Sequence, residues 1–191
     1  MKKIAIFASG TGTNAKRIID HFKHHQQVQV ALILSNNPSA GVLEIAKKED
    51  IPYTIIEREK FFNSNYYQQL LKENNIQWIV LAGFLWKIPV GLISAFPQRI
   101  INIHPALLPK FGGKGMYGSK VHEAVIQSGD KESGITIHYV DEIYDHGKII
   151  FQARSPINSD DDAASLAKKI HELEYQYFPQ VIEGLLTDTK I

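Results

Sequence analysis

Cysteine is absent from the 191 residues of this sequence, and its absence removes several kinds of chemistry at once. Without it there is no thiolate nucleophile, no disulfide framework and no cysteine-ligated metal. Long apolar runs are absent as well, since none approaches the ~20 residues that a membrane span requires. Residues 1–7 form a short apolar run behind two lysines, unlike a secretory signal. We therefore expect a soluble, cytoplasmic protein with no membrane partner.

An excess of charge of either sign is also missing. The sequence has 21 basic and 20 acidic residues, which gives a formal net charge of +1. A nucleic-acid-binding surface normally shows as a basic excess, so no nucleic-acid partner is expected. The apolar fraction of 44% is that of a globular protein, and the length suits one domain. We therefore expect a single domain over residues 1–191.

Short apolar runs alternate with longer amphipathic stretches through the first half. The runs predict strands at residues 3–8, 28–35, 53–56, 77–82 and 99–103, and the stretches predict helices at residues 13–25, 41–49 and 64–73. Continuously apolar strands that alternate with helices indicate a parallel sheet covered on both faces. The fold class expected is α/β, with a Rossmann-like, doubly wound and mostly parallel sheet.

The second half changes character. Residues 135–140 and 148–153 read as two closely joined strands, which suggests a hairpin-like extension of the sheet. Three aspartates at residues 160–162 then supply an N-cap and an acidic first turn for a long final helix over residues 163–186. The stretch 111–119 carries four glycines and is expected to form a mobile loop beside the site.

The most informative pair of residues is Asn102 and His104, at the end of the apolar run 99–103. On a strand the two side chains project from the same face, and Pro105 should end that strand because it cannot donate to a sheet ladder. Both polar groups would then lie at the carboxyl edge, where open α/β sheets bind ligands. An amide beside an imidazole suits a reaction in which an oxyanion develops while a proton moves. An isolated Asn-x-His is, however, more often a turn or a satisfied polar pair.

A glycine turn follows the first predicted strand. Residues 10–15 fit the pattern G-x-G-x-x-A, where backbone N–H groups at a helix start face an anion. A dinucleotide would need a carboxylate after the second strand, but residues 35–37 are Ser-Asn-Asn. No Walker lysine follows Gly12 either. We therefore expect a single phosphate monoester there, with a tight turn that binds nothing as the alternative.

Asp145 lies in the turn between the two late strands, where its carboxylate would hydrogen-bond His104 and raise the pKa of that imidazole. Most Asp-x-Gly turns are only turns, because Asp caps its own backbone and Gly accepts a positive φ. His138 alternates with apolar residues and is expected to be buried behind the site. Five further histidines are expected at the surface: His21, His24, His25, His122 and His171. No zinc-type histidine spacing is present, so no metal is expected, and no serine elbow is present either.

Four segments, taken together, resemble the phosphoribosylglycinamide formyltransferases, a family within the folate-dependent formyltransferases. They are residues 9–14 (Ser-Gly-Thr-Gly-Thr-Asn), 81–84 (Leu-Ala-Gly-Phe), 102–109 (Asn-Ile-His-Pro-Ala-Leu-Leu-Pro) and 145–147 (Asp-His-Gly). The resemblance covers residues 3 to about 186. It implies transfer of a formyl group from 10-formyltetrahydrofolate, a co-substrate, to the amine of 5-phosphoribosylglycinamide in purine biosynthesis. Residues 1–100 would be the phosphate- or nucleotide-binding half and residues 101–191 the catalytic and folate-binding half. A monomer or a homodimer is expected.

The resemblance also implies roles for individual residues. Asn102 and a protonated His104 would stabilise the oxyanion, and Asp145 would raise the pKa of His104 and organise a water that shuttles the proton. The substrate-binding residues implied are Gly12, Thr13, Asn14, Pro105 and Glu174. An exposed helix position is the alternative reading for Glu174.

The folate-binding residues implied are Lys60, Leu85, Trp86, Lys87, Ile88 and Asn102. Here the sequence departs from the family, because better-known members carry Met-Arg-Ile-Leu where residues 85–88 are Leu-Trp-Lys-Ile. An arginine expected near residues 63–66 for the folate tail is missing, and Lys60 is proposed as the substitute cation. The loop at residues 111–119 is also longer and richer in glycine than in those members.

Related activities share the same three catalytic residues. Methionyl-tRNA formyltransferase adds a basic carboxyl-terminal domain, and 10-formyltetrahydrofolate hydrolase adds an amino-terminal regulatory domain. A sugar-nucleotide formyltransferase is closer in size, although the glycine turn favours a simple phosphate. A binding module without catalysis is disfavoured because Asn102, His104 and Asp145 are all present.

Overall fold

The computed structural model describes residues 1–187, and seven strands in that part of the chain form one sheet in the order β3-β2-β1-β4-β5-β6-β7. The strands are β1 (Lys2–Phe7), β2 (Val28–Ser35), β3 (Tyr53–Ile55), β4 (Ile76–Leu81), β5 (Ile100–His104), β6 (Glu132–Tyr139) and β7 (Ile149–Pro156). All neighbouring pairs from β3 to β5 are parallel. The chain order reverses between β1 and β4, which makes their carboxyl ends the switch point where such sheets bind ligands.

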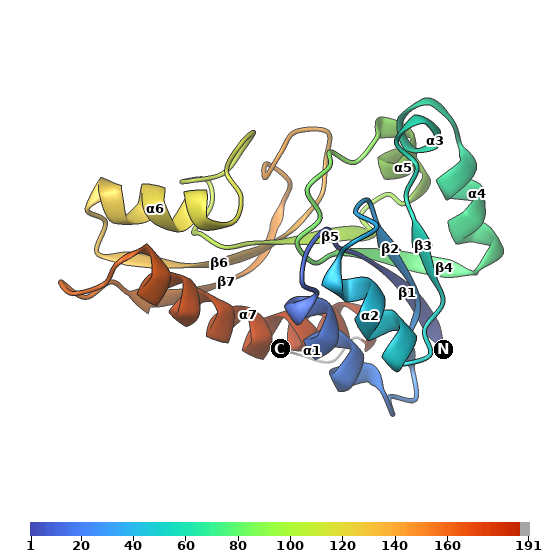
Figure 1. Cartoon of the computed structure of the whole chain (residues 1–191), viewed down its shortest axis with the longest axis horizontal. Helices are drawn as coiled ribbons and strands as arrows, with labels where there is room; N and C mark the ends of the chain where they lie inside the picture. Colours follow the sequence, from blue (N-terminus) through green and yellow to red (C-terminus); the bar gives the residue numbers. More distant parts are fainter. Residues whose placement is uncertain (188–191) are drawn as a thin grey trace.

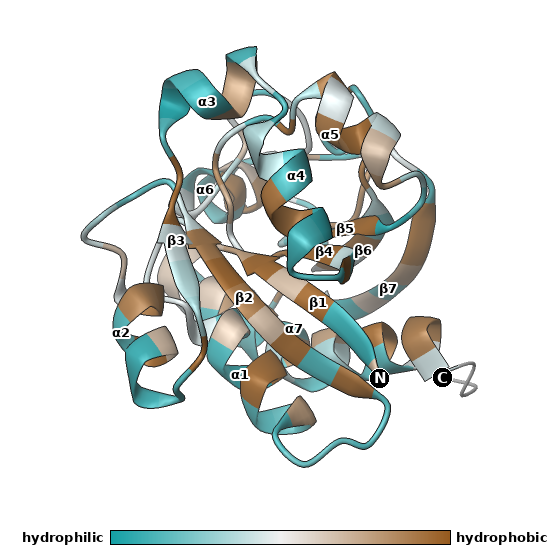
Figure 2. Cartoon of the chain, turned by 90° about the vertical axis from the view of Figure 1, so that its right-hand side faces the viewer, coloured by the Kyte–Doolittle hydropathy of each residue, from teal (hydrophilic) through white to brown (hydrophobic). Residues whose placement is uncertain are grey.

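The helices connect the strands and cover both faces of the sheet. They are α1 (Thr13–Phe22), α2 (Gly41–Lys48), α3 (Arg58–Asn63), α4 (Tyr66–Glu73), α5 (Val90–Ala95), α6 (Ser119–Ser128) and α7 (Ala163–Thr187). One apolar core contains residues of α1, α2, α6 and α7, and a second core contains residues of α3, α4 and α5. Figure 2 shows the apolar strands β1 and β2 enclosed by helices that turn hydrophilic residues outward.

The last two strands run antiparallel and extend the sheet beyond its parallel part. β6 pairs with β5 and β7 pairs with β6, both antiparallel. Figure 1 shows β6 and β7 running out from the parallel strands beside α6 and α7. In the β5–β6 pair, Asn102 lies opposite His138 and His104 lies opposite Thr136. This register brings four polar side chains of two strands to one place.

The predicted fold class is confirmed: a mostly parallel α/β sheet, an antiparallel extension and a long final helix. The prediction for residues 28–35 matches β2 residue for residue. Two helices of six residues each, α3 and α5, were not predicted, because two turns are too short to show a period of 3.6 residues. The predicted helix over residues 13–25 ends at Phe22 instead, and His25 accepts hydrogen bonds from the following backbone.

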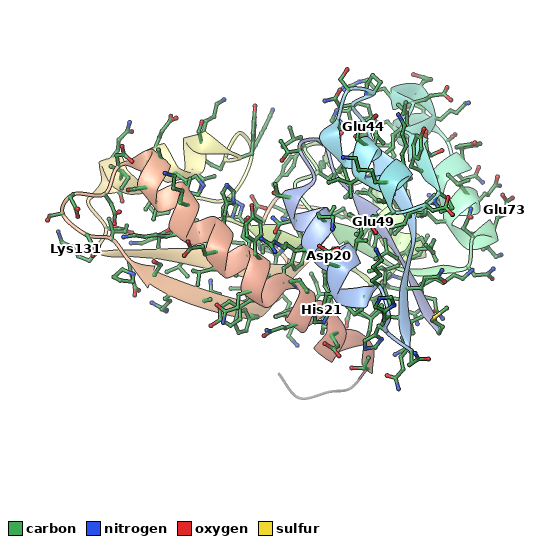
Figure 3. All side chains as sticks on the ribbon, turned by 60° about the horizontal axis from the view of Figure 1, so that its bottom comes forward. Asp20, His21, Glu44, Glu49, Glu73 and Lys131 are labelled. Atoms are coloured by element: carbon green, nitrogen blue, oxygen red, sulfur yellow. The ribbon has the colours of Figure 1, made fainter. Side chains whose placement is uncertain are left out.

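Charged side chains of both signs are spread over the outside of the molecule. Figure 3 shows Lys131 and Glu73 at opposite edges of the molecule, and both are exposed, as is Glu44. Many of these charges pair locally, as Lys47 does with Glu44 at 2.7 Å. Within residues 1–187, no helix combines the length and the apolar character needed to cross a membrane.

Candidate active site

A cavity of about 510 Å³ opens at the carboxyl ends of the central strands. Its walls are the glycine turn after β1, the segment after β4, the end of β5, the loop before α6, the turn between β6 and β7, and one face of α7. The cavity therefore collects nearly all the segments that the sequence singled out. A ligand-binding site at this edge is what the topology predicts.

His104 ends β5 and is 3% exposed. Its Nε2 lies 2.7 Å from the Phe111 carbonyl oxygen, and a carbonyl only accepts, so the ring proton sits on Nε2 and is donated to Phe111. Nδ1 faces Asp145 Oδ2 at 3.5 Å. Burial lowers the pKa of His104 below its ordinary value, against the upward effects of Asp145 and Phe111. Asp145 thus raises the pKa of His104, as expected, but burial outweighs the carboxylate and the net shift is downward.

Asp145 lies in the β6–β7 connection and faces His104, but the predicted hydrogen bond is not formed, because Oδ2 lies 3.5 Å from Nδ1, the ring nitrogen without a proton. Its Oδ2 accepts the backbone N–H of Gly113 at 2.9 Å, and its Oδ1 lies 3.7 Å from His138 Nε2. Burial raises the pKa of Asp145, but His138, His104 and the Gly113 N–H together hold it below its ordinary value. The carboxylate is thus ionised and links the glycine-rich loop to the imidazole of His104.

Asn102 and His138 form a pair across the β5–β6 register. His138 Nδ1 lies 2.8 Å from the Tyr139 carbonyl oxygen and must donate to it, which leaves Nε2 facing Asn102. The Asn102 amide Nδ2 lies 3.1 Å from that Nε2 and donates to it. One amide hydrogen of Asn102 is left without a partner among the described residues. His138 is 2% exposed, which confirms the burial expected for it.

Thr136 shapes the turn that follows His104. Its hydroxyl donates to the Ala106 carbonyl at 2.7 Å and accepts the Leu108 N–H at 3.0 Å. Gln152 on β7 also donates to this hydroxyl at 2.8 Å. The buried Thr136 side chain therefore holds the chain after Pro105 in place, and Pro105 lines the cavity. The sequence analysis did not single out Thr136.

The glycine turn enters α1 as predicted, and Gly12, Thr13 and Asn14 line the cavity. Gly12 has φ 81°, and a Cβ there would lie 2.8 Å from the Cα of Val42. Only glycine suits both the left-handed backbone and the close approach of α2. The first N–H groups of α1 then face the cavity, which is the arrangement that binds anions.

Glu174 is buried on α7, at 4% exposure, so the alternative of an exposed helix residue is wrong. Its Oε2 accepts from Asn14 Nδ2 at 2.9 Å and from His171 Nδ1 at 2.9 Å. The hydrogen bond to Glu174 raises the pKa of His171. His171 is exposed, as predicted, but His122 is only 3% exposed, and its surface assignment is wrong. Both histidines line the cavity beside Glu174.

The segment after β4 contributes Leu85, Trp86, Lys87 and Ile88 to the cavity wall. Ser9, two residues after β1, anchors this segment, because its buried hydroxyl accepts the Leu85 N–H at 2.9 Å. The same hydroxyl donates to Asn36 Oδ1 at 2.5 Å. Ser9 is therefore a positioning residue that the sequence analysis named only as part of the turn motif.

Lys60 is not brought into the cavity. It is exposed, and its Nζ pairs with Glu57 at 2.7 Å on the outside of α3. Arg58, which the sequence analysis did not consider, lies nearer, with its guanidinium 5.3 Å from the ring centroid of Trp86. Among residues 1–187, no group of three or more His, Asp or Glu side chains is arranged to hold a metal ion.

A family model described as formyl transferase matches residues 2–182, so the chain belongs to the formyl transferase family of enzymes. Relatives named phosphoribosylglycinamide formyltransferase match it along its length. The protein of that name from Bacillus subtilis is 37% identical over 97% of this chain and 95% of its own length. The chloroplastic protein of that name from Arabidopsis thaliana is 38% identical over the whole chain, which spans 67% of that relative.

Solved structures agree with this assignment. The crystal structure of phosphoribosylglycinamide formyltransferase from Bacillus halodurans superimposes with a TM-score of 0.88 at 38% identity, over 99% of this chain and 97% of that one. The chain spans 61% of the chloroplastic relative from Vigna unguiculata and 14% of the trifunctional purine biosynthetic protein of Drosophila melanogaster. The resemblance found in the sequence is confirmed.

Proposed function

We propose that this protein transfers the formyl group of 10-formyltetrahydrofolate to the amine of 5-phosphoribosylglycinamide, a reaction of purine biosynthesis. The observation that carries the proposal is the meeting of Asn102, His104 and Asp145 in one cavity with an anion-binding turn. The relatives named phosphoribosylglycinamide formyltransferase support the same reaction. The unbroken sheet through both halves also supports residues 1–191 as one domain.

The cavity offers a distinct place for each part of the two substrates. The backbone N–H groups from Gly12 to Asn14 would hold the phosphate, and the Glu174 carboxylate would accept from ribose hydroxyls. Pro105 would pack beside the glycinamide portion. The segment of residues 85–88 with its Trp86 ring would contact the folate. Lys60 lies outside this arrangement, and Arg58, whose guanidinium stacks on the Trp86 ring, would meet the carboxylates of the folate tail.

The reaction needs stabilisation of a tetrahedral intermediate. The amine nitrogen attacks the formyl carbon, the carbonyl π pair moves to oxygen, and the bond from carbon to the folate nitrogen N10 then breaks. The second amide hydrogen of Asn102 and the Nε2–H of His104 would donate to the oxyanion. The formyl oxygen would replace the Phe111 carbonyl as the acceptor for Nε2–H. One proton leaves the attacking nitrogen and one arrives at N10, so the protons balance.

The neutral resting state of His104 fits this sequence of events. A neutral ring with its proton on Nε2 is already a donor, and negative charge on the formyl oxygen favours proton uptake at Nδ1. Asp145 faces Nδ1 and would stabilise the imidazolium only while the oxyanion exists. A water held by Asp145 would pass the proton between the amine, His104 and the leaving N10. The protonated His104 of the sequence interpretation thus becomes a transient species in the proposal.

A spectrophotometric assay tests the proposed function directly. Purified protein is given a 10-formylfolate donor, and folate release is followed with and without 5-phosphoribosylglycinamide. Release that requires this ribonucleotide supports the proposal. Release without it indicates a hydrolase, and release only with a sugar nucleotide indicates a different acceptor. No release under any of these conditions contradicts the proposal.

A further inference from the structure

His122 is a buried polar residue in the cavity wall that the proposed mechanism leaves unused. It is the fourth residue of α6, is 3% exposed and lines the cavity. Its Nδ1 is sealed from solvent with no hydrogen-bond partner, and no described residue bonds to the ring's other nitrogen, Nε2. Buried polar groups almost always have a partner, so an imidazole without one in a ligand cavity needs an explanation.

The protonation state of this ring follows from its surroundings. Burial lowers the pKa of His122, and His171 and His104 act in the same direction, while only Glu174 opposes them. The ring is therefore neutral at pH 7 and carries one proton. An unpaired buried N–H is the rarer and costlier arrangement, so the proton belongs on Nε2 rather than on the sealed Nδ1. His122 then presents a hydrogen-bond donor to the cavity.

A matching acceptor lies in the same part of the cavity. Glu174 Oε2 is occupied by Asn14 and His171, whereas Oε1 has no hydrogen bond to any described residue. The ring of His122 stands 6.3 Å from that of His171, measured between centroids, and His171 in turn holds Glu174. A donor and an acceptor together suit a hydroxyl, which gives one hydrogen bond and accepts another. A phosphate suits this place less well, because the carboxylate would repel it.

We propose that His122 is a further substrate-binding residue, which donates from Nε2 to a ribose hydroxyl whose own hydrogen is donated to Glu174 Oε1. The inference rests on the proposed function and extends it, since it assigns the sugar specificity to a residue of α6 as well as to α7. The phosphate turn would then anchor the substrate, and His122 with Glu174 would select a sugar that carries the hydroxyl.

Calorimetric titration with three probes tests this assignment: ribose 5-phosphate, 2-deoxyribose 5-phosphate and 3-deoxyribose 5-phosphate. For the wild-type protein, removal of either the 2-hydroxyl or the 3-hydroxyl from ribose 5-phosphate should weaken binding about 3- to 10-fold, the size of one or two neutral hydrogen bonds. His122→Phe should weaken binding of ribose 5-phosphate by a similar factor. In this variant, the ratio of the dissociation constants for that deoxy sugar and for ribose 5-phosphate should be at least threefold smaller than in the wild type. His122→Gln should restore part of the loss, because its amide N–H reaches the Nε2 position.

Exposed His24 provides a matched control, and His24→Gln should change none of the three dissociation constants. If His122→Phe does not fold, the comparison of His122→Gln with His122→Leu replaces it. The proposal would be overturned if wild-type protein bound all three sugar phosphates equally well. It would also be overturned if the His122 variants preferred ribose 5-phosphate as strongly as the wild type does. Sugar discrimination that depends on His122 without ribonucleotide-dependent formyl transfer would overturn the proposed reaction instead. Transfer with indifferent His122 variants would overturn only the role of His122.

Discussion

The two ends of the cavity differ in how completely the protein satisfies its own polar atoms. At the end proposed for catalysis, both ring nitrogens of His104 have a neighbour within 3.5 Å, and His138 bonds to Asn102 and to the backbone. At the sugar end, Asn14 Oδ1 and His122 Nδ1 are buried without partners. The groups proposed for catalysis are therefore held in place before any substrate arrives, which favours electrostatic stabilisation of a transition state. Each of these unpaired atoms at the sugar end costs about 1–3 kcal/mol. The proposed contacts of the sugar are instead His122 Nε2 and Glu174 Oε1, which have no hydrogen bond to a described residue.

His104→Ala is expected to give the largest difference between turnover, which depends on one end of the cavity, and sugar-phosphate binding, which depends on the other. Formyl transfer should fall about 10³-fold, because a donor to the oxyanion and a proton carrier are lost together. Binding of ribose 5-phosphate should stay within about twofold of the wild-type value, since the phosphate turn and Glu174 are unchanged. Steady-state kinetics and calorimetry give the two numbers. A parallel loss of turnover and binding would remove the distinction between the ends.

Asp145→Asn comes next in expected size, with a loss of about 10²-fold in turnover. Asp145 has φ 54°, a left-handed conformation that asparagine tolerates, so the variant removes charge without adding backbone strain. The pKa of His104 should fall further, because Asp145 is one of the groups that raise it. NMR titration of the imidazole measures that shift. Turnover equal to wild type would exclude Asp145 from proton transfer.

Glu174→Gln should act at the sugar end with a smaller effect. We expect KM for the ribonucleotide to rise about 10-fold through the loss of a charged acceptor, while kcat changes little. The pKa of His171 should drop towards its ordinary value, because the hydrogen bond to Glu174 is what raises it. Kinetics with saturating folate donor and an NMR titration of His171 test both statements. A fall in kcat at unchanged KM would contradict the assignment of Glu174 to the sugar end of the cavity.

The smallest effect concerns stability and pH. Burial lowers the pKa values of His104 and His122, so below pH 6.5 the unfolded chain takes up protons that the folded protein refuses. Stability should therefore decline as the pH falls from 6.5 through the lowered pKa values and should be fully present above 6.5. His122→Gln should reduce the difference in unfolding free energy between pH 7.5 and pH 5.5, as measured by urea denaturation. A steeper decline in the variant would contradict the assignment of His122 as a buried neutral ring.

The parallel half of the fold was readable from sequence for a simple reason. Buried strands such as β2 are mostly apolar, and the glycine turn at Gly12 directly follows a strand and opens a helix. The convergence of Asn102, His104 and Asp145 on one cavity was also expected, because each lies at the end of a predicted strand or in the turn between two strands. Their meeting depends on the antiparallel register of β5 and β6, which residue patterns alone do not determine.

The sequence could not predict the net direction of the pKa shift of His104, which depends on both burial and charge. The rise expected in the pKa of His104 considered Asp145 alone, whereas the depth of the ring below the surface depends on the whole fold. His122 was misplaced for a different reason. It stands three residues before Val125 on the buried stripe of α6, and that spacing was a usable signal. Lys60 was chosen for its charge, but its place on α3 directs it towards Glu57.

The register between β5 and β6 limits how this protein can change over evolution. Because side chains alternate along a strand, an inserted residue within β6 would turn Thr136 and His138 to the opposite face and leave Asn102 and His104 without their supports. Such a protein would keep the same number of apolar residues and still lose the arrangement of polar side chains at the cavity. Length variation in this half is therefore expected to accumulate in the connections, before α6 and between β6 and β7, and to spare the strand between them. A designer who wishes to graft a new acceptor specificity should lengthen those connections and leave the β5–β6 pairing as it is.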